Sequence, residues 1–232
     1  MKKTIILLFM LSTLLITGCT IKKSCQDLED QFSRDDCYLD KATGAVVLGT
    51  CSNIQSDIVR NSCIAEIGIK KNDLSICNSI QGKSRDYCIA KTAITNKDFS
   101  LCNEIKTAYW SDICNKDIAI AKNDHMLCAK IIDLLEKDKC FDTIAKATLD
   151  VNPCFYIYDE TTHDKCVRKI AVETLNETLC EETRGVVLGD ICYQKIAQLK
   201  KNESICAEIS FFEIKEACRA MMKSILNNTN EE

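Results

Sequence analysis

The sequence lacks the short motifs that mark the common enzyme active sites. HExxH, GxSxG, SxxK and GxGxxG are all absent, which removes the signatures of zinc peptidases, serine hydrolases, penicillin-binding enzymes and dinucleotide-binding domains. Gly82-Lys83-Ser84 resembles the end of a phosphate-binding loop, but Cys77 stands where that loop needs its upstream glycine. We therefore expect that the protein is not an enzyme.

Histidine is scarce, and closely spaced cysteines are missing. Neither His125 nor His163 lies at a spacing from a cysteine that is typical of a nucleophile or a metal ligand. Zinc and copper(I) sites usually use cysteines two to four residues apart, whereas the cysteines from Cys25 to Cys218 are never closer than eleven. No CxxC pair is available for redox exchange. The sequence predicts no metal site and no cofactor.

The chain also lacks a basic run beyond Lys22 and Lys23, next to the N-terminal leader. Removing Lys2 and Lys3 with that leader leaves 28 basic residues against 34 acidic ones, a net charge of −6. Binding to nucleic acid needs clustered lysine and arginine to neutralise phosphates. We expect no nucleic-acid partner.

The first 18 residues have the features of a secretory leader. Lys2 and Lys3 precede an apolar stretch that is too short to span a membrane stably. The segment Leu15-Ile16-Thr17-Gly18-Cys19 resembles the lipobox of prokaryotic lipoproteins. This resemblance implies a signal peptide over 1–18, lipidation of Cys19 and a short tether over 19–24. An ordinary cleaved leader that leaves one odd cysteine is the alternative.

Sixteen further cysteines form a regular ladder. Their spacing alternates between 12 and 14 residues, with one spacing of 11, so the chain contains eight units of about 26 residues. An even, dense set of cysteines predicts a disulfide framework in an oxidising, extracytoplasmic space. The alternative is a thiolate store for copper or zinc. The set comprises Cys25, Cys37, Cys51, Cys63, Cys77, Cys88, Cys102, Cys114, Cys128, Cys140, Cys154, Cys166, Cys180, Cys192, Cys206 and Cys218.

Each unit reads as two short helices. In six units Asp or Asn lies four residues before the first cysteine, where it predicts the N-terminal cap of a helix of eight to ten residues. An acid or Asn lies two residues before every second cysteine, as in Asp112 and Asp138, and suits the start of the second helix. The second helix carries the pattern Cys-x-x-x-Ile-Ala, whose small residue allows close approach of a neighbour. The pattern predicts structural caps rather than a carboxylate relay.

Geometry favours disulfides within each unit. Two cysteines 12 residues apart on one helix would be about 18 Å apart, far beyond the limit of about 7 Å for a disulfide. A bridged unit must therefore fold back into a hairpin, with both cysteines near its turn. Pairing across units leaves a height mismatch of about 6 Å. We predict pairing in order, from Cys25–Cys37 to Cys206–Cys218.

Stacked, disulfide-clasped helical hairpins of this kind resemble the cysteine-rich Sel1-like and tetratricopeptide-like solenoids of bacterial envelopes. The resemblance covers 25–223 and implies an all-α solenoid of eight repeats; the residues after it, 224–232, read as a polar tail. It also implies a general role in binding proteins or peptides. The unit is shorter than the 34-residue tetratricopeptide repeat and lacks its Trp, Gly and Tyr pattern, so no family site residue is transferred.

Apolar residues recur six to eight residues after the first cysteine, where a turn should be polar. They predict either a partner-binding edge or packing between adjacent hairpins, and the sequence leaves both open. Our hypothesis is a lipid-anchored module on the cell membrane or outer membrane that binds a protein or peptide, or holds a partner as a spacer. The candidate edge comprises Tyr109, Trp110, Leu134, Leu135, Val187 and Phe212.

Overall fold

The structure is a computed structural model that describes residues 24–228 of the 232-residue chain. The predicted leader, Cys19 and most of the tether lie outside the described residues, as does the end of the predicted tail from 229. Residues 24–228 form helices and connecting segments, with no strand among them. Their contacts divide the described residues into two compact units, up to Cys63 and from Ile64 onward.

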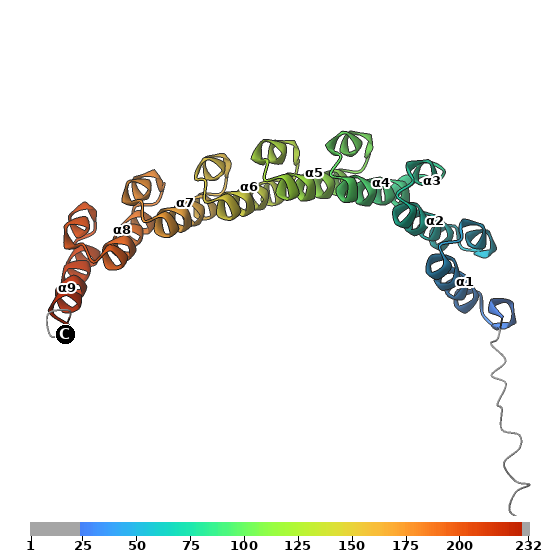
Figure 1. Ribbon diagram of the computed structural model, residues 1–232, viewed down its shortest axis with the longest axis horizontal. Helices are drawn as coiled ribbons and strands as arrows, with labels where there is room; N and C mark the ends of the chain where they lie inside the picture. Colours follow the sequence, from blue (N-terminus) through green and yellow to red (C-terminus); the bar gives the residue numbers. More distant parts are fainter. Residues whose placement is uncertain (1–23, 229–232) are drawn as a thin grey trace, which may run out of the picture. The chain divides into compact units, whose positions relative to one another are not determined.

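One long helix occurs in each of the eight repeats. Seven of these helices are 15 residues long and the last has 17. Within the second compact unit, α4 to α9 lie side by side in a row (Figure 1). The long helices are α1 (Gln31–Ala45), α2 (Asp57–Lys71), α4 (Gly82–Asn96), α5 (Ala108–Lys122), α6 (Leu134–Thr148), α7 (Glu160–Thr174), α8 (Val186–Lys200) and α9 (Phe212–Asn228).

A short helical segment precedes each long helix and completes the repeat. In the second unit these segments lie along one side of the row (Figure 1). The predicted all-α solenoid of eight helix pairs is thereby confirmed. The short segments are η1 (Cys25–Asp27), η2 (Leu48–Asn53), α3 (Leu74–Asn78), η3 (Phe99–Glu104), η4 (His125–Lys130), η5 (Asn152–Tyr156), η6 (Glu177–Glu182) and η7 (Glu203–Glu208).

The predicted length of the first helix is wrong. Seven of the short segments are 3₁₀ helices of three to six residues, and α3 has only five residues. The reason is local: the residue three positions after the first cysteine, such as Ile131 or Ile157, is extended at φ −71° or −72° and its side chain is buried. Burying this isoleucine requires the chain to leave the helix, and short 3₁₀ turns fit such connections.

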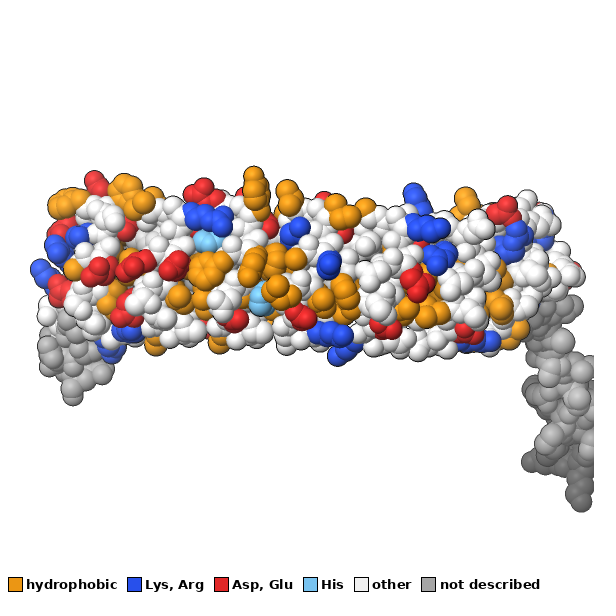
Figure 2. All heavy atoms as spheres, turned by 90° about the horizontal axis from the view of Figure 1, so that it is seen from above, with side chains coloured by type: hydrophobic (Ala, Val, Ile, Leu, Met, Phe, Trp, Pro, Cys, Tyr) orange, Lys and Arg blue, Asp and Glu red, His pale blue; other side chains and the backbone are white. Residues whose placement is uncertain are grey.

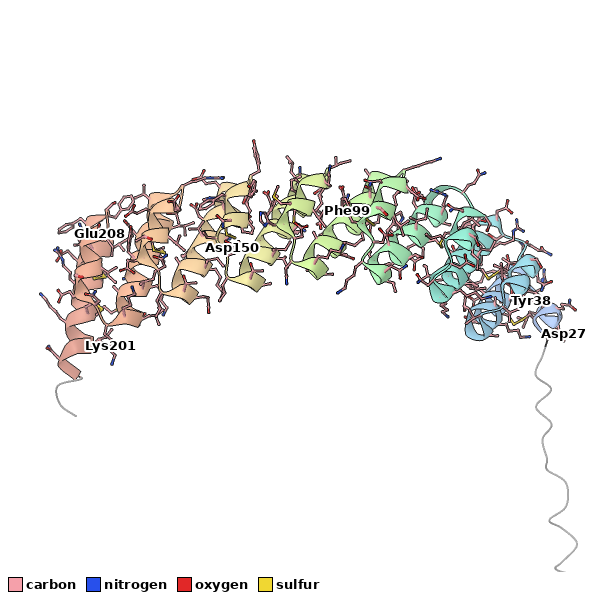
Figure 3. The ribbon with its side chains drawn as sticks, turned by 45° about the horizontal axis from the view of Figure 1, so that its top comes forward. Asp27, Tyr38, Phe99, Asp150, Lys201 and Glu208 are labelled. Atoms are coloured by element: carbon pink, nitrogen blue, oxygen red, sulfur yellow. A yellow bond between two sulfur atoms is a disulfide. The ribbon has the colours of Figure 1, made fainter. Side chains whose placement is uncertain are left out.

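Every cysteine from Cys25 to Cys218 is bonded within its own repeat, so that the short segment is tied to the long helix (Figure 3). The Cα atoms of each pair are 5.5 to 5.8 Å apart, within the range of an ordinary disulfide. The bonds are Cys25–Cys37, Cys51–Cys63, Cys77–Cys88, Cys102–Cys114, Cys128–Cys140, Cys154–Cys166, Cys180–Cys192 and Cys206–Cys218.

The predicted Asx caps are confirmed at the start of the short segments. In each case the side-chain oxygen accepts a hydrogen bond from the backbone N–H two residues further on. At Asp98, for example, the donor is the N–H of Ser100, at 2.9 Å. Such a bond satisfies one of the backbone donors that a helix start leaves unpaired. The caps are Asp73, Asp98, Asp124, Asp150, Asn176 and Asn202.

The second row of acids does not cap its own helix, and that prediction is wrong. Asp112 and Asp138 are the fifth residues of α5 and α6 and are buried. Each carboxylate accepts hydrogen bonds from two backbone N–H groups. These donors lie 20 and 21 residues further on, in the segment just before the next long helix. The donor–acceptor distances over six such junctions are 2.8 to 3.2 Å. The junction acids are Asp35, Asp86, Asp112, Asp138, Asp164 and Asp190.

The Ile-Ala pattern of the long helices forms the core of the stack. The isoleucines four residues after the second cysteine, such as Ile144 and Ile170, are at most 1 % exposed. The small residues that follow them face the disulfide of the next repeat: Ala119 belongs to the same buried cluster as Cys128 and Cys140. Where Gly68 replaces alanine, an added Cβ would lie 2.9 Å from Cys88 Sγ. The small residue therefore makes room for the next disulfide.

Candidate binding surface

The first turns of α5, α6, α8 and α9 carry exposed apolar side chains along one edge of the second unit. Tyr109, Leu135 and Phe212 are 67 %, 63 % and 71 % exposed, and Leu134 and Val187 are also exposed. Figure 2 shows hydrophobic side chains at intervals along its upper edge. The hypothesis that these five residues only pack between repeats does not fit their exposure.

Trp110 differs from the rest of the predicted edge. Its ring is half-buried and packs against the rings of Tyr87 and Tyr109, with centroids 5.0 Å apart in both pairs. The hydroxyl of Tyr87 donates to Glu66 at 2.7 Å, and burial together with this bond raises the pKa of Tyr87 to about 12. Trp110 thus packs against the ring of Tyr109, and it contributes less exposed surface to the edge than the sequence suggested.

Three exposed apolar residues extend the edge beyond the sequence-based set. Ile132 and Tyr158 are 68 % and 77 % exposed and lie four residues after a first cysteine, and Phe211 lies just before α9. Sequence reasoning missed Ile132 and Tyr158 because only two of the eight repeats carry an apolar residue at that position. We call the whole set the apolar row: Tyr109, Ile132, Leu134, Leu135, Tyr158, Val187, Phe211 and Phe212.

A groove of about 680 Å³ opens between α5 and α6 within the apolar row. Tyr109, Ile132 and Leu135 line it, and so does the ion pair between Lys116 and Glu136. The structure therefore brings Tyr109 and Leu135 to one site, whereas Val187 and Phe212 lie further along the row. A groove lined by both apolar and charged side chains can hold an apolar side chain of a partner beside polar groups that fix its orientation.

The ion pair in this groove persists at neutral pH. Glu136 accepts hydrogen bonds from Lys116 at 2.5 Å and from Lys139 at 2.7 Å. The bond from Lys116, followed by that from Lys139, lowers the pKa of Glu136 to about 2. The Glu136 carboxylate is therefore ionised under all ordinary conditions, and it fixes the Lys116 ammonium beside the apolar wall.

The two histidines have structural surroundings. His163 is 3 % exposed, and its Nδ1 lies 2.9 Å from Asp164, the junction acid that also accepts from Arg184 and Gly185. His125 packs its ring against Tyr156, with centroids 5.7 Å apart. No group of three or more His, Cys, Asp or Glu residues suited to a metal ion occurs within 24–228.

Along the described part of the chain, no helix has both the length and the apolar character needed to cross a membrane. The eight disulfides indicate an oxidising, extracytoplasmic environment. In the comparisons with known proteins, no family model, no curated protein and no solved structure matches this chain.

Proposed function

We propose that the protein is a lipid-anchored repeat module of the cell envelope that binds another protein or a peptide along the apolar row. The observation that carries the proposal is the exposure of large apolar side chains on the first turns of α5, α6, α8 and α9. Surface patches of this kind commonly mark interaction sites in otherwise polar proteins. The disulfides support the proposal because each one holds a short segment against the start of its own long helix, where the residues of the row lie.

The proposed anchor is Cys19, at the end of the lipobox-like segment. Two or more acyl chains at this position would hold the module on the surface of the cell membrane or the outer membrane. The test is detergent-phase partitioning of the full chain, with mass analysis of its N-terminal peptide. We expect wild-type protein in the detergent phase and Cys19→Ser in the aqueous phase. Equal partitioning of the two proteins would contradict the anchor.

Binding at the apolar row is tested with peptides selected from a random 12-residue library against the oxidised protein. We expect the selected peptides to bind the double variant Tyr109→Ser/Leu135→Ser at least tenfold more weakly. Met126→Ser is the matched control, because Met126 is 59 % exposed and lies outside the row. If both variants bind like the wild type while remaining folded, the row is not the binding surface.

The alternative of a metal-storing lipoprotein requires free thiolates at the positions that form disulfides in the structure. Intact mass of the mature protein under non-reducing conditions distinguishes the two. We expect the mass to be lower by sixteen hydrogens than that of the fully reduced protein. Sixteen free or metal-loaded thiols would replace the binding-module proposal with the storage proposal.

A further inference from the structure

A second groove, of different chemistry, lies between α7, α8 and α9. It has a volume of about 430 Å³. Lys165, Arg168 and Lys169 line it from α7, and Lys195 lines it from α8. Arg168 and Lys169 are three and four positions after Lys165, which makes both of them neighbours of Lys165 on the helix surface. We call this site the basic groove.

The positive charge of the basic groove is largely uncompensated. Its one lining carboxylate, Glu173, accepts from Lys169 at 2.6 Å. Lys195 donates to the neutral Gln198 at 3.0 Å. Neither Lys165 nor Arg168 forms an ion pair within 24–228. In a chain with a net charge of −4, this local excess of cations favours an anionic ligand.

The remaining lining residues indicate more than a small inorganic anion. Val172, Ile191 and Met221 provide apolar surface, and Gln194 and Gln198 provide amide donors and acceptors. The cations can bind carboxylates, the amides can bind a peptide backbone, and the apolar residues can contact apolar side chains. An acidic peptide offers all three kinds of group. We propose that the basic groove binds an acidic peptide segment in which glutamate or aspartate alternates with apolar residues.

This inference goes beyond binding at the apolar row, because the two sites share no residue. Arg168 is the residue expected to contribute most. A guanidinium can hold a carboxylate through two parallel N–H bonds, and Arg168 is half-buried with no competing ion pair in the described chain. Lys195, across the groove on α8, is placed to bind a second carboxylate.

The test uses fluorescence anisotropy of a labelled eight-residue peptide that alternates glutamate and leucine, added to the oxidised full chain. The comparison peptide has glutamine in place of glutamate. We expect the acidic peptide to bind at least tenfold more tightly than the glutamine peptide, and to lose at least threefold in affinity between 50 and 200 mM salt, because the contacts are ionic. Equal binding of both peptides, or no binding up to 1 mM, overturns the proposal.

The matched variants are Arg168→Gln/Lys195→Ala and Lys91→Ala. Lys91 occupies the position of Lys195, three residues after its second cysteine, but it lies on α4 outside the groove. The groove variant should bind the acidic peptide at least fivefold more weakly, whereas Lys91→Ala and Leu135→Ser should bind it normally. An equal loss with Lys91→Ala would show a nonspecific charge effect and overturn the site.

A lipid surface is the competing source of negative charge. Vesicles with and without phosphatidylglycerol, mixed with protein that carries Cys19→Ser, distinguish it from a peptide. Recruitment to the anionic vesicles that the groove variant abolishes, without binding of the acidic peptide, would overturn the peptide assignment. Absence of recruitment together with peptide binding supports it.

Discussion

A buried aspartate at each of six junctions links one repeat to the next. Each buried carboxylate accepts hydrogen bonds from two backbone N–H groups that precede a long helix, and these bonds are part-buried. A carboxylate is well suited to this position because it offers only acceptors. Asparagine, with a similar shape, would present an NH₂ group to one of the two donors.

Replacing Asp138 by asparagine should therefore destabilise the junction between α6 and α7. One of the two bonds, from Tyr158 or from Asp159, is lost, and a hydrogen bond to a charged acceptor contributes about 1.5–3 kcal/mol. Amide exchange at residues 158–162 should become at least fivefold faster. Glu216→Gln is the control: it has the same position in the last repeat but is exposed, so its exchange should not change.

Gly68 is the second position where one residue decides the fit between repeats. An added Cβ would lie 2.9 Å from Cys88 Sγ and 3.2 Å from Ile76, atoms that are buried and tied to the helix by the disulfide. Gly68→Ala should lower the denaturation midpoint. The overpacking cost of about 1–3 kcal/mol exceeds the gain of about 1 kcal/mol in helix propensity.

The control for Gly68 is Gly44, which also lies in a long helix but has no atom within 4 Å of an added Cβ. Gly44→Ala should raise the midpoint, because only the propensity term remains. If both alanine variants are stabilised, the disulfide moves away at low cost and the packing argument for the small residue fails.

At the level of the elements, the short segments depend on their disulfides. Segment η4 (His125–Lys130) has six residues, far fewer than an isolated helix needs in water. The bond Cys128–Cys140 closes a short loop, which contributes about 3 kcal/mol by restricting the unfolded chain. The long helix α6 is less dependent, because it also packs against α5 and α7.

Removing this disulfide should release the short segment before the long helix. In Cys128→Ser/Cys140→Ser, amide exchange over 125–131 should rise at least a hundredfold, and exchange in the middle of α6 should rise much less. Met126→Ser changes an exposed side chain in the same segment and should leave exchange nearly unchanged. A uniform rise over both elements would show that the repeat unfolds as one unit.

The sequence predicted the period, the helix pairs and the Asx caps because each depends on residues close together in the chain. The junction acids were misassigned because their partners lie 20 and 21 residues away, in the next repeat. The short segments were predicted to be longer helices because Ile131 and its equivalents fit the apolar face of a helix. The same residues are equally compatible with the extended conformation that they adopt in the structure. Leu135 and Phe212 are exposed, whereas Trp110 is half-buried. This difference depends on packing between side chains, which the repeat pattern does not show.

At the scale of the whole molecule, stability should be the sum of the repeats and the contacts between neighbours. The junction acids supply part of the contact between neighbouring repeats, and at Asp35 and Asp164 the folded structure shifts the pKa of the carboxyl group. Hydrogen bonding from the backbone N–H of Gln55 lowers the pKa of Asp35. At Asp164, burial raises the pKa, but hydrogen bonds from His163, Arg184 and Gly185 outweigh it, so the pKa of Asp164 is also lowered.

These two shifts fix the direction of the pH dependence. A carboxyl group whose pKa is lower in the folded state stabilises the fold above its unfolded value, here 3.8, and loses that contribution as pH falls through the folded pKa. The urea midpoint of the oxidised protein should thus change little between pH 7 and 5 and fall below about pH 4. The transition should also broaden, because neighbouring repeats uncouple while the disulfides remain.

Replacing Asp164 by asparagine tests the coupling role of this junction acid. Asp164→Asn should lower the urea midpoint at pH 7 and reduce the drop of the midpoint on acidification. A variant with the same midpoint as the wild type at pH 7 and at pH 3 would contradict that role.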